Sequence, residues 1–135
     1  MDVAINNWAV LVAAVASAVI GAVWYSPFMF GNAWMRLLGR SEEEVKKGNP
    51  KRAMIGSFIT TLITAYVLAM FVGYIDASTP TDGLQLGFWV WLGFVATVGF
   101  NTVLFEGKPR RLYLINATYQ LISLLVMAMI LAMWQ

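Results

Sequence analysis

Long apolar stretches alternate with short polar segments along the whole chain. Four of these stretches are long enough to be membrane-spanning helices, over residues 8–25, 53–75, 84–105 and 112–134. At a rise of about 1.5 Å per residue, each can cross a hydrocarbon layer about 30 Å thick. None of the four contains Asp, Glu, Lys or Arg. The pattern predicts an all-α integral membrane four-helix bundle, with residues 1–135 forming a single transmembrane domain.

A shorter amphipathic helix is predicted over 27–38, in the loop that joins the first two spans. Its apolar residues recur at helical spacing on one face, and Arg36 lies on the other. Ser26 and Pro27 resemble an N-cap followed by a proline at the first helical position. The segment is too short to span a membrane, so we expect it to lie in the interface.

Other turn residues predict where the remaining helices begin and end. Thr79 and Pro80 repeat the pattern of a cap followed by proline before the third span, and Gly107 is a suitable stop after it. Ser41 with Glu44 fits a capping box and predicts a further short helix in the first loop.

Composition excludes several classes of function. Of 135 residues, 60% are hydrophobic and 12% are charged, which is far from the usage of a soluble domain. The chain has no Cys and no His, which removes disulfides, thiolate or imidazole metal sites and every pairing of a nucleophile with His. We therefore expect no catalytic residue, no metal and no cofactor, hence no enzyme, although chemistry on a lipid head group stays open. No basic folded domain is available for nucleic acid.

The cations predict an orientation in the membrane. All nine Lys and Arg residues fall in two loops, whereas the loop between the second and third spans carries Asp76 and Asp82 and no cation. Cationic loops are retained in the cytoplasm during insertion. We expect both termini outside a cytoplasmic (inner) membrane, and anionic lipid at the two basic loops. The nine cations are Arg36, Arg40, Lys46, Lys47, Lys51, Arg52, Lys108, Arg110 and Arg111.

Polar side chains inside the spans are the candidates for a polar path or an interhelical network. They are Ser57, Thr60, Thr61 and Thr64 on the second span, Asn101 on the third, and Asn116, Gln120 and Ser123 on the fourth. The hydroxyls can bond back to their own helix, as in a packing stripe, or line a hydrated path. The amides need partners in hydrocarbon, so Asn101 and Asn116 either pair with each other or belong to a solute site.

A second group of residues is predicted at the cytoplasmic interface, as anchors or as a gate: Trp24, Tyr25, Ser26, Pro27, Trp34, Glu106, Arg110 and Arg111. Glu106 either forms an ion pair that fixes the turn between the last two spans, or contacts a head group. The segment from Trp24 onward either anchors the helix that follows it or lets that helix act as a lid.

Three sequence motifs carry a resemblance to a known family. They are the run from Trp24 to Met35 (WYSPFMFGNAWM), the run TPTDG that starts at Thr79, and the run LFEGK that starts at Leu104 and is followed by LINA at 114–117. Over nearly its whole length the chain resembles domain-of-unknown-function family 1761, small four-helix bacterial membrane proteins. The resemblance implies the four-span topology and a bacterial setting, and it brings no reaction and no substrate.

Two functions remain open on the sequence. The first is an oligomeric transporter-like or channel-like component for a small neutral solute or ion, with Gly83 and Gly87 as candidate contacts between protomers. The alternative is a non-transporting subunit that binds lipid or another membrane component. The absence of charged residues from the spans argues against proton-coupled chemistry, which usually needs a titratable group in the membrane.

Overall fold

The computed structural model describes residues 3–39, 48 and 50–135, and within them the chain is helical without strands. The elements are α1 (Asn7–Trp24), α2 (Gly31–Leu38), α4 (Pro50–Tyr74), α5 (Pro80–Trp91), the π-helical turn η1 (Leu92–Ala96), α6 (Thr97–Gly99), α7 (Asn101–Leu104) and α8 (Arg110–Met133). Four helices, counting Pro80–Leu104 as one, are long and apolar enough to cross a membrane. The predicted all-α membrane bundle is confirmed. The helix predicted from Ser41 lies outside the described residues.

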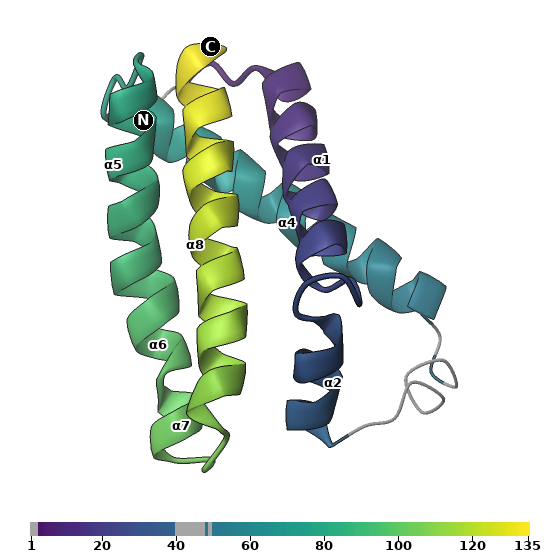
Figure 1. Ribbon diagram of the computed structural model, residues 1–135. Coiled ribbons are helices and arrows are strands. Elements are labelled where there is room, and N and C mark those ends of the chain that lie inside the picture. Colours follow the sequence, from purple (N-terminus) through teal and green to yellow (C-terminus); the bar gives the residue numbers. More distant parts are fainter. Residues whose placement is uncertain (1–2, 40–47, 49) are drawn as a thin grey trace.

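Helix α8 is the centre of the bundle. It lies between α5 and α1, and α4 passes behind (Figure 1). Its buried residues Leu124, Met127 and Leu131 form the core together with small residues of α1, such as Ala13 and Ala14. In lipid, where apolar surface gives little drive for association, small residues of this kind let helix backbones approach closely.

Two glycines bring α5 against α8. A Cβ atom added at Gly83 would lie 2.7 Å from the Ala128 carbonyl oxygen, and one at Gly87 would lie 2.9 Å from the Leu124 carbonyl oxygen. Both glycines are buried within the chain. Their predicted role as contacts between protomers is therefore wrong: the close approach they permit is used inside one chain.

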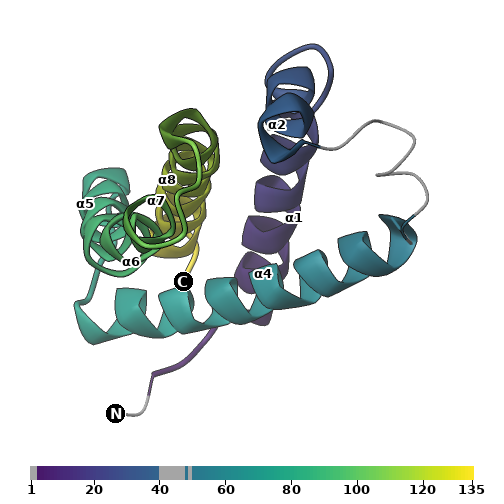
Figure 2. The same cartoon turned by 90° about the horizontal axis from the view of Figure 1, so that it is seen from below.

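Helix α4 crosses the other long helices at a steep angle (Figure 2). Its buried residues, Ala65, Leu68, Ala69 and Val72, all lie in its second half. The first half stands away from the bundle, and Met54 and Ile55 are largely exposed there. In a bilayer this half contacts lipid or another protein.

The short helix predicted over 27–38 is present but begins at Gly31. Ser26 does not cap it, because the Ser26 hydroxyl donates to the Val23 carbonyl at 2.7 Å. The axis of α2 runs along the bundle beside the basic half of α8, and α2 is seen end-on from below (Figures 1 and 2). We predicted a helix lying in the interface plane; the turn after Tyr25 instead directs α2 along α8.

The third span is confirmed, but it is not a uniform α-helix. Thr79 caps its start as predicted, and the structure adds a capping box, in which the Asp82 carboxylate accepts from the Thr79 amide. At η1 the backbone hydrogen bonding is π-helical, as in the bond from the Thr97 amide to the Leu92 carbonyl five residues earlier. The Ala96 carbonyl there accepts from the Tyr113 hydroxyl of α8 at 2.6 Å. π-Helical turns occur often at functional sites. Gly107, with a φ of 66°, ends the span as predicted.

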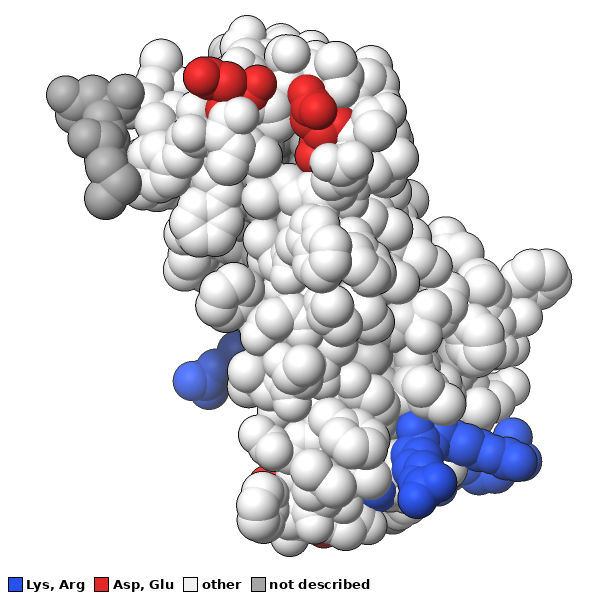
Figure 3. Space-filling view, turned by 90° about the vertical axis from the view of Figure 1, so that its left-hand side faces the viewer, with Lys and Arg blue, Asp and Glu red and all other residues white. Residues whose placement is uncertain are grey.

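Charge divides the bundle into two ends. Acidic side chains gather at the top of Figure 3, whereas Lys and Arg lie in its lower half. Asp76 lies in the connection between α4 and α5, and Asp82 lies in the first turn of α5. We call the end formed by α2 and the α7–α8 turn the basic end; it carries Arg36, Lys108, Arg110 and Arg111. The opposite end, where α1 starts and α8 finishes, is the acidic end.

Candidate functional site

The segment from Trp24 to Gly31 is a compact turn that connects α1 to α2. The Phe30 amide donates to the Trp24 carbonyl at 3.0 Å, and the Gly31 amide donates to the Ser26 carbonyl at 2.9 Å. A Cβ atom at Gly31 would lie only 2.4 Å from the Tyr25 carbonyl oxygen. Only glycine fits this position, because backbone occupies the space of a side chain.

Aromatic residues of this turn join it to α8. The Trp24 indole N–H donates to the Ile115 carbonyl at 3.0 Å, and the Tyr25 hydroxyl donates to Asn116 Oδ1 at 2.6 Å. The Tyr25 ring meets Trp34 of α2 edge-on, with ring centres 5.4 Å apart. Together these contacts fix the positions of α1, α2 and α8 relative to one another. We call the residues that make them the joint: Trp24, Tyr25, Gly31, Trp34 and Asn116. The gate residues Trp24, Tyr25 and Trp34 are thus brought together, whereas Pro27 is exposed.

A chain of hydroxyls continues from the joint into the bundle. Tyr119 meets the Tyr25 ring, and its hydroxyl donates to the Ser17 carbonyl at 3.1 Å. The Ser17 hydroxyl in turn bonds to Ser123, and both serines are buried. Gly21 leaves room for Tyr119, since a Cβ there would lie 3.0 Å from the Tyr119 oxygen. Ser123 thus belongs to an interhelical network, as predicted; Tyr119 was missed, although it shares a helix face with Asn116 and Ser123.

Removing both buried serines is expected to reveal a modest coupling. Ser17→Ala and Ser123→Ala should each destabilise the protein, because each leaves the other hydroxyl with one partner fewer. The double variant should be more stable than the sum of the two losses predicts, by about 0.6 kcal/mol and at most about 1.7 kcal/mol, the range for such bonds in membranes. Unfolding free energies of the four proteins in mixed micelles give the coupling. A coupling of zero would contradict a direct bond.

A pocket of about 230 Å³ opens beside the joint, between α8, the end of α2 and the segment from η1 to the α7–α8 turn. Asn116 and Gln120, which are one turn apart on α8, both line it. Its other lining residues are Leu38, Val95, Gly99, Thr102, Lys108, Leu112, Tyr113 and Ala117. We call it the amide pocket.

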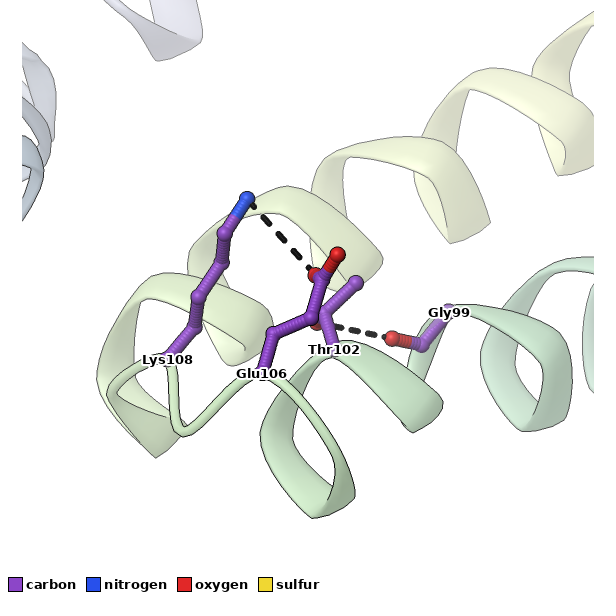
Figure 4. Close-up of polar contacts among 4 residues, drawn as sticks. All are labelled: Gly99, Thr102, Glu106 and Lys108. Atoms are coloured by element: carbon purple, nitrogen blue, oxygen red, sulfur yellow. Dashed lines mark hydrogen bonds and ion pairs between the residues drawn. The ribbon is translucent and has the colours of Figure 1, made fainter.

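Lys108 of the α7–α8 turn lines one edge of the amide pocket. Figure 4 shows Lys108 and Glu106 of this turn. There the Lys108 ammonium lies 3.9 Å from a Glu106 carboxylate oxygen, and both side chains are about half exposed. The Thr102 hydroxyl donates to the Gly99 carbonyl at 2.9 Å and is thereby satisfied within its own helix. Glu106 thus forms the predicted ion pair of the turn, with Lys108 as its partner.

A second hollow of about 490 Å³ separates α2 from α8 on another side of α2. Its apolar walls come from Phe30, Ala33, Leu37, Leu114 and Ile115. Arg36 of α2 and Arg111 of α8 also line it. We call it the arginine groove. Neither arginine has an acidic partner among the described residues.

The remaining predicted residues lie apart from these two hollows. Thr60 and Thr61 donate to the Ser57 carbonyl, both at 2.8 Å, and Thr64 donates to the Thr60 carbonyl at 3.0 Å. These hydroxyls of α4 are satisfied by their own helix. Asn101 is exposed on α7, and Asn116 bonds to Tyr25, so the predicted pair of Asn101 with Asn116 is wrong. Arg110 is exposed and lines neither hollow.

The side chains that line the two hollows can bind a ligand. Within residues 3–39, 48 and 50–135, no group of three or more His, Cys, Asp or Glu residues could hold a metal ion. The amide pocket offers carboxamides and one ion pair, and the arginine groove offers two guanidinium groups above apolar side chains. Both hollows lie at the basic end, and both use α2 and α8 as walls.

Comparison with known proteins gives a family but no activity. The family model described as "Protein of unknown function (DUF1761)" matches residues 8–132, which is nearly the whole chain. No curated protein and no solved structure matches. The three motifs noted in the sequence all fall within the matched range. The chain belongs to the DUF1761 family of proteins of unknown function.

Proposed function

We propose that this membrane protein is a non-transporting module that binds an acidic phospholipid in the arginine groove. One observation carries the proposal: two guanidinium groups, from Arg36 and Arg111, line a groove whose other walls are apolar. An acidic phospholipid has the same division, with a charged phosphate joined to an apolar chain. Guanidinium groups bind phosphate in a bidentate manner, and they do so better than a point charge.

The position of the groove supports this proposal. Arg111 is the second residue of α8, so it stands where a spanning helix leaves the hydrocarbon. Leu114 and Ile115 follow within one turn toward the membrane interior, where an acyl chain lies. With the cationic loops in the cytoplasm, the groove faces the leaflet that is rich in anionic lipid. This orientation, in a bacterial inner membrane with both termini outside, is part of the proposal.

Transport was the first function expected from the sequence. The structure supports transport less than it supports lipid binding. The hydroxyls of α4 bond to their own helix, and the amide pocket shares no lining residue with the hollow of about 260 Å³ at the acidic end. A path would therefore have to form between chains. The homo-oligomer that transport requires stays a prediction, which the mass of the protein in lipid nanodiscs tests. No reaction is assigned to the chain.

Neutralising the groove is expected to release the lipid. A hydrogen bond to a charged group contributes about 1.5–3 kcal/mol, so losing one such bond from each arginine should make Arg36→Gln/Arg111→Gln bind phosphatidylglycerol about 100-fold more weakly. Native mass spectrometry of the full chain, taken from nanodiscs of phosphatidylglycerol and phosphatidylcholine, counts the retained acidic lipid.

The control is Lys51→Gln/Arg110→Gln, which removes the same charge from residues that do not line the groove. It should retain phosphatidylglycerol nearly as the wild type does, since its effect is limited to general surface attraction. Equal losses in the two double variants would mean that surface charge alone holds the lipid. Full retention in the groove variant would exclude the arginine groove as the site.

A further inference from the structure

The amide pocket contains polar groups that the protein itself leaves without partners. Asn116 Oδ1 accepts from Tyr25, so the two N–H donors of its Nδ2 atom remain. Gln120 is an exposed residue of α8, and its carboxamide has no hydrogen-bond partner among the described residues. Asn116 lies about two turns, and Gln120 about three turns, into a spanning helix that begins at Arg110. An unpaired amide in hydrocarbon costs several kcal/mol, so a polar molecule held in the pocket would stabilise both side chains.

The size of the pocket limits what can fill it. A volume of about 230 Å³ corresponds to about eight water molecules at roughly 30 Å³ each. It lies below the range of roughly 300–1,000 Å³ for drug-sized ligands. The apolar walls, which include Leu38, Val95 and Leu112, leave the two amides as the groups that orient a ligand.

The charge of the pocket limits the ligand further. Lys108 is the charged residue among those that line it, and the Glu106 carboxylate at 3.9 Å offsets that charge. A bound ion would have no fixed opposite charge left to meet it. A neutral molecule that accepts from Asn116 and also donates to the Gln120 carbonyl satisfies the groups that remain.

We propose that the amide pocket is a binding site for a small uncharged solute of the carboxamide or urea class. Such a molecule has a carbonyl acceptor and an N–H donor side by side, so it can form two hydrogen bonds with the carboxamide of Gln120. Its carbonyl oxygen can also accept a second hydrogen bond, from Asn116. The proposal concerns binding and does not depend on the lipid in the arginine groove, because the two hollows share no lining residue.

The test uses acetamide as the probe and the full chain in lipid nanodiscs. Saturation-transfer NMR, corrected for empty nanodiscs, should show acetamide binding to the wild type. Gln120→Leu should weaken that binding about tenfold and leave the unfolding midpoint no lower, since Gln120 bonds to no described residue in the free protein. N,N-Dimethylacetamide, which cannot donate a hydrogen bond, should bind to the wild type more weakly than acetamide.

Asn101→Leu is the matched control, because it removes the same functional group from an exposed site outside the pocket. It should bind acetamide as the wild type does. Arg36→Gln/Arg111→Gln should also bind acetamide normally, so a negative result for the acetamide site can be told apart from a negative result for the lipid site. Equal binding by Gln120→Leu and Asn101→Leu would overturn the proposal. A wild-type signal no larger than that of empty nanodiscs would overturn it as well.

Discussion

Gly83→Ala is expected to lower the free energy of unfolding by about 2–3 kcal/mol, at the upper end of the effect of overpacking. The new Cβ would lie 2.7 Å from the Ala128 carbonyl oxygen and 2.8 Å from Met129 Cα. Both are backbone atoms, so no change of rotamer can relieve the clash and α5 must move away from α8. Reversible unfolding of the purified protein in mixed micelles, followed by circular dichroism, measures the loss.

Gly56→Ala is the matched control for this prediction. Gly56 lies within α4, and no atom would come within 4 Å of its added Cβ. Alanine is favoured over glycine in a helix interior by about 0.5–1 kcal/mol, so this variant should be slightly more stable than the wild type. Gly87→Ala should behave like Gly83→Ala. If Gly83→Ala and Gly56→Ala had the same stability, the close approach of α5 to α8 would be refuted.

The span pattern of the chain was readable from the sequence because it depends on local properties. Uninterrupted apolar length predicts a helix that can cross a membrane, and Thr79 followed by Pro80 predicts a helix start. Both act over a few residues and need no knowledge of what lies beside them. The same reasoning failed at Ser26 and Pro27, where the chain makes a turn of four further residues before α2 begins.

Pairing between helices could not be read in the same way. Gly83 and Gly87 predict that another helix packs closely against their own, but they do not identify that helix as α8 or as part of a second chain. The Asn116 carboxamide requires a hydrogen-bond partner, and either Asn101 or the Tyr25 hydroxyl could be that partner chemically. The choice is made by the direction of α2 after Tyr25, which follows from the close packing at Gly31.

The two hollows illustrate the same limit. Asn116 and Gln120 are one turn apart on one helix, so their shared pocket was predictable from spacing. Arg36 and Arg111 are far apart in the sequence, and they line one groove only because the joint places α2 beside α8. The joint is therefore a structural requirement for the proposed lipid site, although none of Tyr25, Gly31 and Asn116 lines the arginine groove.

Gly31→Ala is accordingly expected to release α2 from α8. The added Cβ would lie 2.4 Å from the Tyr25 carbonyl oxygen and 2.8 Å from the Ser26 carbonyl group, so the turn must open. Opening it separates Trp24 from the Ile115 carbonyl and Tyr25 from Asn116. Amide hydrogen exchange over Gly31–Leu38 should rise to the rate of a frayed helix. Retention of phosphatidylglycerol should fall to the level of the Arg36→Gln/Arg111→Gln variant, although both arginines are still present.

Gly39→Asn, at the other end of α2, is the control for Gly31→Ala. It tests whether replacing any glycine beside α2 would release the helix. Gly39 has a φ of 72° and nothing within 4 Å of an added Cβ, and asparagine tolerates the left-handed conformation. Gly39→Asn should therefore keep slow exchange over α2 and full lipid retention. Slow exchange over α2 in Gly31→Ala would contradict the role of the joint. Fast exchange with full lipid retention would show instead that the acidic lipid does not need α2, and that the arginine groove is not where it binds.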